Sequence, residues 1–371
     1  MAATLVLALA VGGCVPWYDG TPTDFYDLPE GGQQAPGSLA RVQKWTEQSN
    51  ASTNVYRVAY WTKDRRDRTV KATGIVRVPT AAPPTAGTAI GAWDHGTTGL
   101  APQCAPSRVS AGYPTPYLPA GVPVAIPDYI GLGPNGQMHA WLAGVSEARA
   151  TIDLVRATRY LPNVRHNGDW WVAGHSQGGH AALFSGEHAE SYAPELDLQG
   201  VVAIAPGTKL NEPSYVTSYM KPAAVMTVYG LQLDYPETIQ VSDYATPEAE
   251  AQLGVLETGC INEITVAYVG MPQVVDVDPW QDQELVDLLV ANEPGHAGSD
   301  VPVLVVQGGT DFIVQPAYTR EYAERACAAG TTVKLTEYPN ADHGTIVGQA
   351  ATEATQWIAT VSAGQAPPTS C

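Results

Sequence analysis

The sequence predicts an α/β protein with a mostly parallel central sheet and helices packed on both of its faces. Two observations support this fold class. Short apolar runs typical of buried strands alternate with longer segments of helical spacing, and glycine-rich loops follow several of these runs. The chain has 371 residues, of which 44% are apolar and 15% charged, and this is enough for a large core. We therefore expect a globular protein whose function gathers at the carboxyl ends of its strands.

The first elements precede this alternation. Residues 15–50 are rich in Gly, Pro and Gln and predict an extended lead-in with one short helix at residues 40–48. Residues 55–62 and 69–78 have the composition of strands and flank the charged turn KDRRD. We expect them to form an antiparallel hairpin at one edge of the sheet.

The alternating part of the chain supplies the rest of the sheet. Residues 138–161 have the apolar spacing of a long amphipathic helix. Because strands that are separated by helices usually pair in parallel, most of the sheet should be parallel. Further strands are expected at residues 88–93, 122–126, 170–173, 201–204, 301–307 and 331–338, and further helices at residues 178–184 and 345–361.

One interval, residues 207–300, breaks this rhythm because it contains no obvious strand–helix unit. We interpret it as a helical cap inserted into a core made of residues 15–206 and 301–371. The alternative is a separate small domain with its own partner. We favour the cap because both ends of the interval lead back into the core. Helices within it are expected at residues 215–229, 247–268 and 281–291.

The N-terminus, residues 1–14, has the pattern of an export signal. Its apolar stretch is too short to cross a bilayer and fits the hydrophobic part of such a signal, although the usual preceding positive residue is missing. The residues VGGC at its end are similar to a bacterial lipobox, in which the cysteine is lipidated. Two alternatives follow, a surface lipoprotein anchored through Cys14 or a plainly secreted protein, and both predict export.

The remaining cysteines, Cys104, Cys260, Cys327 and Cys371, form an even set that suits an oxidising compartment. Four cysteines allow three pairings, and the spacing does not choose among them. They are too scattered for a zinc site, and the histidines show no H-E-x-x-H spacing. We therefore expect disulfides and no metal or cofactor.

The charge balance restricts the partners. Acidic residues outnumber basic ones 37 to 19, which gives a formal net charge of −18. Such a surface repels phosphate backbones, so we expect no nucleic-acid partner and only weak adsorption to anionic lipid.

The motif that carries chemistry is the pentapeptide GHSQG, in which Ser176 lies between Gly174 and Gly178. It follows a predicted strand and precedes a predicted helix, which is the context that a nucleophile elbow requires. On such a tight turn the serine is exposed, and larger side chains at the two glycine positions would clash. The alternative is a loop serine that caps a helix. We identify Ser176 as the candidate nucleophile.

A serine nucleophile needs a base and an acid, which in this context follow it in the order Ser, Asp, His. Asp311 follows a predicted strand and a glycine turn, and His343 lies in the loop after the next strand. Both should reach the carboxyl edge of the sheet near Ser176. We therefore predict a triad of Ser176, Asp311 and His343.

Three other residues compete for these roles. His180 lies in the serine's own helix and should face packing or solvent, and His296 at the end of the cap is the weaker alternative base. Asp342 is the alternative acid, but the side chain of a chain neighbour rarely reaches the imidazole Nδ1.

Two backbone N–H groups are predicted to hold the oxyanion. The Gln177 N–H begins the helix after Ser176, and the Asp94 N–H lies in the loop after an earlier strand. Asp94 and His95 could instead pair to stiffen this loop. Tyr129 also ends a strand and could either line the pocket or pack in the core.

The segments WDHGTTG, DYIGLG, GHSQGG, GGTDFIVQP and ADHGT together resemble the secretory lipase family, typified by fungal lipases of the A type with bacterial relatives. The resemblance covers residues 24–358. It implies an α/β-hydrolase fold with a helical cap and hydrolysis of lipid-like esters. It also implies Ser176, Asp311 and His343 as the triad, and Asp94 and Gln177 as the oxyanion donors.

The resemblance further implies a disulfide between cap and core, which would pair Cys260 with Cys327 and leave Cys104 with Cys371. One departure concerns the C-terminus. Fungal members carry a long segment after the histidine that covers the acyl tunnel, whereas this chain has only a helix and a short Pro-rich tail. We therefore expect shorter acyl esters.

The sequence thus predicts a secreted or surface-anchored monomeric serine ester hydrolase, a lipase or esterase, without cofactor. One alternative is a peptidase or amidase with the same triad, for which the cap carboxylates Glu237, Glu248 and Glu250 could anchor a substrate amine. Another is a non-catalytic surface protein that binds a partner through its cap.

Overall fold

The computed structural model describes residues 15–29, 31–110, 112, 117–216 and 219–371. The predicted export signal and Cys14 lie outside these residues. Within the described residues, no helix is long and apolar enough to cross a membrane.

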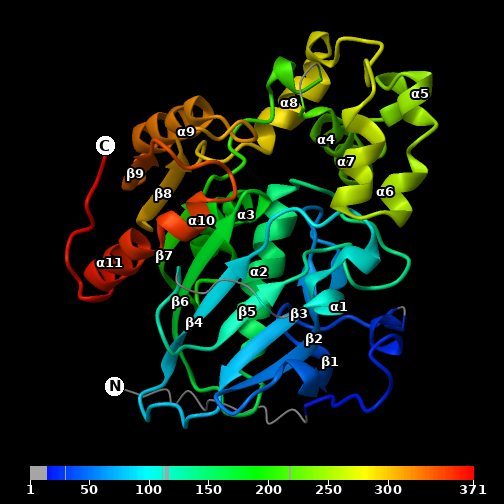
Figure 1. Ribbon diagram of the computed structural model, residues 1–371. Coiled ribbons are helices and arrows are strands. Elements are labelled where there is room, and N and C mark those ends of the chain that lie inside the picture. The colour runs from blue at the N-terminus through cyan, green and yellow to red at the C-terminus, as the bar shows by residue number, and fades with distance from the viewer. Residues whose placement is uncertain (1–14, 30, 111, 113–116, 217–218) are drawn as a thin grey trace, which may run out of the picture.

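A nine-stranded sheet forms the centre of the molecule, in the order β1-β2-β3-β5-β4-β6-β7-β8-β9 (Figure 1). The pairs that involve β1, β2 and β3 are antiparallel, and all pairs from β5 to β9 are parallel. This confirms the predicted fold class and the predicted antiparallel hairpin of β2 and β3, but β1 lies outside β2, so the hairpin does not form the edge of the sheet. The strands are β1 (Leu39–Lys44), β2 (Thr53–Lys63), β3 (Thr69–Pro79), β4 (Thr88–Asp94), β5 (Val124–Pro127), β6 (His166–His175), β7 (Asp197–Ile204), β8 (Val303–Gly308) and β9 (Val333–Tyr338).

Helices connect these strands and cover the sheet. The α-helices are α1 (Pro106–Val109), α2 (Gly144–Thr158), α3 (Gln177–Tyr192), α4 (Lys221–Asp234), α5 (Pro247–Glu250), α6 (Gly254–Thr258), α7 (Ile261–Val269), α8 (Gln283–Ala291), α9 (Pro316–Ala328), α10 (Ile346–Gln349) and α11 (Ala351–Ser362). The 3-10 helices are η1 (Asp24–Tyr26), η2 (Thr46–Gln48), η3 (Pro102–Cys104), η4 (Pro213–Val216), η5 (Val241–Asp243) and η6 (Pro279–Gln281).

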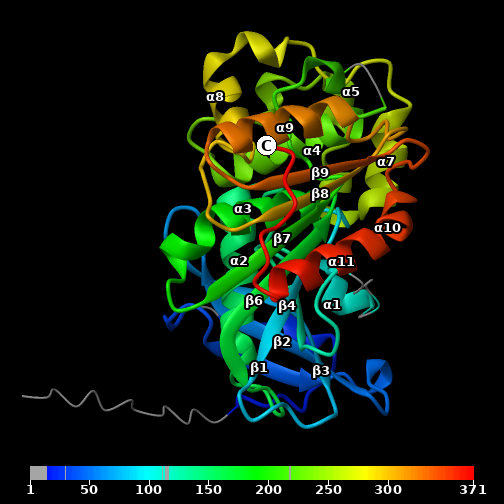
Figure 2. The ribbon, with the colours of Figure 1, turned by 90° about the vertical axis from the view of Figure 1, so that its left-hand side faces the viewer.

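The apolar residues of the central strand β6 alternate between two buried layers. Trp170 and Val172 pack with α2, α3 and α9 on one face, whereas Trp171 and Ala173 pack with α10 and α11 on the other (Figure 2). Side chains point to opposite faces at successive strand positions, so a continuous apolar run is what a strand buried on both faces requires.

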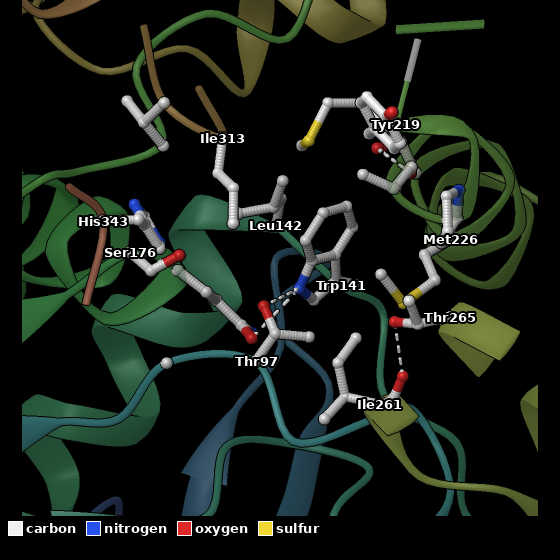
Figure 3. A pocket seen from close by; sticks show the side chains of 18 of the residues that line it. Thr97, Trp141, Leu142, Ser176, Tyr219, Met226, Ile261, Thr265, Ile313 and His343 are labelled. Atoms are coloured by element: carbon white, nitrogen blue, oxygen red, sulfur yellow. Dashed lines mark hydrogen bonds between the residues drawn. The ribbon is translucent and has the colours of Figure 1, made fainter. Parts of the chain in front are cut away.

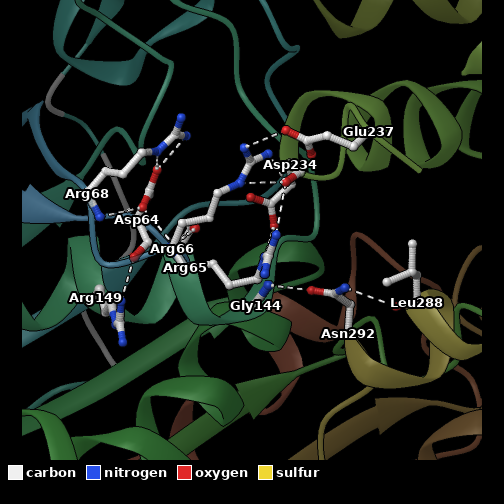
Figure 4. Close-up of polar contacts among 11 residues, drawn as sticks. Asp64, Arg65, Arg66, Arg68, Gly144, Arg149, Asp234, Glu237, Leu288 and Asn292 are labelled. Carbon is white, nitrogen blue, oxygen red and sulfur yellow. Dashed lines mark hydrogen bonds and ion pairs between the residues drawn. The ribbon is translucent and has the colours of Figure 1, made fainter. Parts of the chain in front are cut away.

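The cap is the helical segment between β7 and β8, and it stands over the end of the sheet in Figure 1. It has its own apolar cluster, which includes Met226, Tyr229 and Tyr268. The hairpin between β2 and β3 also reaches the cap: Arg65 Nε lies 2.9 Å from Asp234 Oδ2, at the end of α4 (Figure 4). The cap is therefore tied to the core by polar contacts in addition to its two chain connections.

The disulfides differ from the predicted pairing. Cys104 pairs with Cys260, and Cys327 pairs with Cys371. The predicted pairs Cys260–Cys327 and Cys104–Cys371 are therefore wrong. The reason is the route of the C-terminal tail, which runs along the edge strand β9, where Ser370 N donates to the Val333 carbonyl, and so reaches α9. A link between core and cap is present, but Cys104 supplies its core half.

Several helix predictions also need correction. Residues 247–268 form three short helices, α5, α6 and α7, and α4 spans Lys221–Asp234 instead of residues 215–229. Residues 40–48 are not one helix: Leu39–Lys44 forms β1 on the free edge of β2, which satisfies its backbone groups, and only Thr46–Gln48 forms a short 3-10 helix. The helix predicted at 138–161 begins only at Gly144, since Leu142 has a positive φ of 59° and the preceding residues form turns. These turns line the site described next.

Candidate active site

Ser176 lies on the sharp turn between β6 and α3, with φ of 60° and ψ of −119°. A Cβ placed on Gly178 would lie 1.9 Å from the Asp94 carbonyl oxygen, and one on Gly174 would lie 2.1 Å from the Gly178 carbonyl oxygen. Only glycine fits at both positions. The strained conformation of a non-glycine residue here is typical of a functional site.

The other two predicted residues lie together beside this turn. Asp311 follows β8 and His343 follows β9, and His343 Nδ1 lies 2.7 Å from Asp311 Oδ2. Figure 3 shows the His343 ring next to the Ser176 side chain. The three residues, far apart in the sequence, thus meet at the carboxyl ends of three parallel strands.

The Asp311 carboxylate is held by its own loop. Its Oδ1 accepts hydrogen bonds from the Ile313 and Val314 N–H groups, both at 2.9 Å, and its Oδ2 also accepts one from Gln307 Nε2 at 3.2 Å. These bonds fix the carboxylate in the orientation in which it meets the imidazole.

A second histidine orients the His343 loop. His175 Nε2 lies 2.8 Å from the His343 carbonyl oxygen, and the two rings are 4.6 Å apart. Burial and the neighbouring His343 lower the pKa of His175 to about 4. His175 is therefore neutral near pH 7, and its Nε2–H donates to the carbonyl.

The competing residues lie apart from this group. His296 is exposed in the loop that follows the cap, and Asp342 is exposed, with its Oδ1 accepting bonds from Gly344 and Thr345. His180 is buried and bonds to Glu147 rather than to His343 or solvent.

Ser176 and His343 line a cavity of about 580 Å³ between core and cap. Its walls are largely apolar, with Trp141 and Leu142 from the core and Met226 from the cap (Figure 3). Lys209 is the one Lys, Arg, Asp or Glu among the described residues that line it. The volume is in the range of small-molecule sites, and such walls suit an apolar ligand.

The two predicted oxyanion residues differ in position. Gln177 lines the cavity, but Asp94 is fully buried beside it, and its Oδ1 accepts a bond from Thr151 Oγ1 at 2.7 Å. Burial raises the pKa of the Asp94 carboxyl well above its usual value. Gly96, two residues further, does line the cavity, and a Cβ placed on it would lie 3.7 Å from the Ser176 Cβ.

Tyr129 packs in the core instead of lining the cavity. It is fully buried, its hydroxyl donates to the His95 carbonyl at 3.0 Å, and its ring packs against the His95 ring at a tilt of 32°, with ring centroids 4.5 Å apart. Burial lowers the pKa of His95 to about 4, so this loop is held by a neutral imidazole.

Sequence reasoning missed a group of buried polar residues behind Ser176. The Gln177 amide contacts Glu147, His139 and Trp141, at distances of 2.7, 2.7 and 3.0 Å. All four residues are at most 9% exposed. Three of them, His139, Trp141 and Glu147, lie within the helix predicted at 138–161. The positive φ of Leu142, which separates His139 and Trp141 from the observed helix, has no clear signal in the sequence.

No cluster of three or more His, Cys, Asp or Glu side chains that could hold a metal occurs in the part of the chain that the structure describes.

The strand order, the strand–turn–helix at Ser176 and the cap inserted after β7 define an α/β-hydrolase fold. The model of the secretory lipase family matches residues 113–369, which is more than half of the chain, and the chain belongs to this family.

Several relatives in sequence support this assignment. Lipase A of Moesziomyces aphidis is 28% identical over 269 residues, a match that covers 64% of this chain but only 55% of the relative. Trichothecene C-3 esterase of Fusarium sporotrichioides is 25% identical, with 94% of this chain and 83% of the relative covered. Secreted triacylglycerol lipase LIP1 of Malassezia furfur is 26% identical, and the match covers 62% of this chain and 49% of the relative. The chain thus spans about half the length of two of these relatives.

Solved structures share the fold. Candida antarctica lipase A in its closed state superposes with a TM-score of 0.77 at 20% identity, covering 94% of this chain and 88% of that one. The rice cell wall degrading esterase LipA from Xanthomonas oryzae gives a TM-score of 0.71 at 16% identity, covering 90% of this chain and all of that one.

Proposed function

We propose that the protein is a secreted serine hydrolase that cleaves carboxylic esters of lipid-like or other acyl substrates. The observation that carries this proposal is the position of Ser176, on a strained turn at the wall of an apolar cavity with the His343–Asp311 pair beside it. Membership of the secretory lipase family and its lipase and esterase relatives supports the same class of reaction.

Each member of the triad has a separate role. His343 takes the proton from the Ser176 hydroxyl as its oxygen attacks the ester carbonyl, and then gives that proton to the leaving alcohol. Asp311 holds the imidazole through Nδ1–H, so that Nε2 is the free base, and stabilises the imidazolium that forms. Water, activated by His343 in turn, then attacks the acyl-enzyme, releases the acid and restores Ser176.

The oxyanion of each tetrahedral intermediate is held by backbone N–H groups. Gln177 supplies the first donor, because it is the first residue of α3 and its N–H belongs to the positive end of the helix dipole. We assign the second donor to the backbone of residues 94–97, which begins at the predicted Asp94 and passes Ser176 at Gly96. Preorganised donors of this kind usually supply a large part of the rate enhancement.

The cavity favours an apolar acyl group over a charged peptide. No carboxylate is among the described residues that line it, so Glu237, Glu248 and Glu250 do not stand where they would anchor a substrate amine. The relatives' names, lipase, triacylglycerol lipase and trichothecene esterase, span several alcohols, so the alcohol group stays open. We propose acyl chains of short to medium length, because the cavity of about 580 Å³ has to hold the acyl group together with part of the alcohol.

Export is part of the proposal. The family is described as secretory, and the apolar N-terminal segment predicts an export signal. The two intramolecular disulfides suit an oxidising compartment. Whether Cys14 carries a lipid is tested by mass spectrometry of the mature protein from its own host.

The test is a series of p-nitrophenyl esters from acetyl to palmitoyl, with Ser176→Ala as the matched control. We expect hydrolysis that is fastest at short to medium chains and is lost in the variant. A p-nitroanilide with the best acyl group keeps a closely similar leaving group and tests the peptidase alternative. Ester hydrolysis that persists in Ser176→Ala, or preferential cleavage of the anilide, would contradict the proposal.

A further inference from the structure

A buried carboxylate, Glu147 of α2, lies directly behind the first turn of α3. It is 1% exposed. Its Oε1 accepts a hydrogen bond from the Gln177 side-chain amide at 2.7 Å and from Leu142 N–H at 3.2 Å, and its Oε2 lies 2.9 Å from His180 Nδ1. The Glu147 side chain therefore holds Gln177, which follows Ser176, and His180, one turn further along α3. It also holds the backbone of Leu142, which lines the cavity.

The hydrogen-bond roles of the two His180 ring nitrogens follow from their partners. Its Nε2 lies 2.8 Å from the Asn292 carbonyl oxygen, which can only accept, so Nε2 carries a hydrogen. Its Nδ1 faces the Glu147 carboxylate. Burial alone would raise the pKa of Glu147, but its hydrogen bonds with His180, Gln177 and Leu142 N–H favour the ionised carboxylate. One hydrogen therefore lies between His180 Nδ1 and Glu147 Oε2, and the two side chains form a buried hydrogen-bonded pair.

The orientation of the Gln177 amide is fixed in the same way. The Trp141 indole N–H can only donate, so it bonds to the Gln177 oxygen, and the amide nitrogen then donates to Glu147 and to His139 Nε2. His139 Nδ1 lies 2.9 Å from the Ile130 carbonyl oxygen and therefore donates to it. Both hydrogens and the oxygen of the Gln177 side-chain amide therefore have a partner, so this side chain has a single favourable orientation.

These side-chain contacts also fix the backbone that forms the oxyanion site. Gln177 and His180 lie in the first turn of α3, and His180 N–H donates to the Ser176 carbonyl at 3.1 Å. Fixing both side chains fixes the turn that carries Ser176 and the Gln177 N–H. Misplacement of such a donor lowers the rate steeply because its bond forms only with the developing oxyanion.

We propose that Glu147 is a positioning residue that sets the oxyanion donor of Gln177 by clamping the first turn of α3 through Gln177 and His180. The inference rests on the proposed function, since an oxyanion donor matters only if Ser176 forms tetrahedral intermediates. The group of Glu147, Gln177 and His180 also contacts the cap, because the Asn292 carbonyl accepts a bond from His180 Nε2. The Asn292 side chain adds a second contact by accepting a bond from Gly144 N–H at 3.2 Å (Figure 4).

The experiment is a double-mutant cycle between Glu147→Ala and Gln177→Met, which removes the side-chain anchor but keeps the backbone donor. The first readout is the rate at which a fluorophosphonate labels Ser176, because this reaction needs the nucleophile and the oxyanion site whatever the substrate. The second is the split between kcat and KM on the best ester. Circular dichroism and thermal unfolding report whether each variant is folded.

We expect each single variant to lower the labelling rate and kcat by about 10- to 100-fold with little change in KM, and the double variant to resemble the singles. Glu147→Gln should recover most of the loss, because its amide can accept from Gln177 and donate to a neutral His180. The matched control is Asp153→Asn, another buried carboxyl of α2 whose partners are Thr62, Tyr192 and Arg156. It should lower stability but leave kcat unchanged.

Additive effects in the double variant, or a folded Gln177→Met with an unchanged labelling rate, would overturn the inference. If Glu147→Ala does not fold, the Gln177→Met result decides alone. Labelling of the wild type without ester hydrolysis would contradict the proposed function, but the role of Glu147 could still be tested by the labelling rate. Absence of labelling in the wild type would overturn both.

Discussion

The His343 imidazole and the Asp311 carboxylate are held 2.7 Å apart by loops that follow neighbouring parallel strands. Asp311→Asn keeps the shape of this pair but lets the amide favour the wrong imidazole tautomer. By the precedent of serine proteases, kcat should fall by about 10⁴-fold with little change in stability. Steady-state kinetics on the best ester, with thermal unfolding alongside, measures this.

The control for this variant is Asp342→Asn, which changes the exposed carboxylate adjacent to His343 in the chain. Its oxygen caps the following turn through Gly344 and Thr345, so we expect a small stability loss and near-normal kcat. If kcat falls more in Asp342→Asn than in Asp311→Asn, then Asp342 and not Asp311 is the acid of the triad, which would contradict the assignment.

Gly178 should tolerate no side chain. A Cβ there would lie 1.9 Å from the Asp94 carbonyl oxygen, which is backbone and cannot move aside cheaply. Gly178→Ala should lower the free energy of unfolding by at least about 1 to 3 kcal/mol and lower fluorophosphonate labelling of Ser176. Chemical denaturation measures the first effect.

The matched control is Gly348→Ala in α10, where an added Cβ would meet no atom within 4 Å. This change should leave labelling of Ser176 unchanged. It should leave the free energy of unfolding unchanged or raise it slightly, since alanine has a higher helix propensity than glycine. Equal effects of the two substitutions would remove the steric explanation.

Arg65 should hold the cap onto the core. Its guanidinium bonds to the Asp234 carboxylate at the end of α4 at 2.9 Å (Figure 4). It also lies 3.8 Å from the centroid of the Tyr235 ring, at the C-terminal cap of α4. Arg65→Ala should lower stability by about 1 to 2 kcal/mol and increase hydrogen exchange in α4. Arg68→Ala is the control, because its partner Asp64 lies in the same hairpin. Exchange in α4 that is raised equally by Arg68→Ala would refute the link.

Glu187 of α3 should make stability depend on pH. Burial, its largest influence, raises the pKa of this carboxyl from 4.5 to about 7, although it accepts a bond from Gly295 N–H. Between these pH values the folded chain binds more protons at Glu187 than the unfolded chain. Its contribution to the free energy of unfolding therefore falls as pH rises through this window.

The variant Glu187→Gln cannot ionise and keeps an oxygen that can accept from Gly295. Its stability relative to the wild type should increase from pH 4.5 to about 7 and then level off, by on the order of 1 kcal/mol or more. Denaturation at several pH values, with Glu190→Gln as an exposed control on the same helix, measures this. A difference that does not vary across the window would contradict it.

Elements with strong local signals could be predicted from the sequence. The run from Trp170 to Phe184 combines an apolar strand, two glycines and a helix, and β6, the Ser176 turn and α3 follow it closely. Asp311 and His343 could be found because chain order and position after a strand restrict the choice. Physical contacts between distant segments were harder. Leu39–Lys44 became a strand through the free edge of β2, and Cys371 reached Cys327 through a tail that runs along β9.

The group around Glu147 could not be predicted for a similar reason. A glutamate inside a predicted amphipathic helix is ordinarily a solvated side chain. Its burial depends on where α2 meets α3 and on the left-handed Leu142, which moves Trp141 and His139 off the helix. These are properties of the packed structure, and single-sequence patterns do not carry them.

The central claim is that Ser176 is the nucleophile of a hydrolytic site. The most direct test is to treat the folded protein with a fluorophosphonate, digest it and locate the adduct by mass spectrometry. We predict one adduct, on the peptide that contains Ser176, and none in Ser176→Ala. An adduct at another residue, or no adduct on the wild-type protein, would contradict the account.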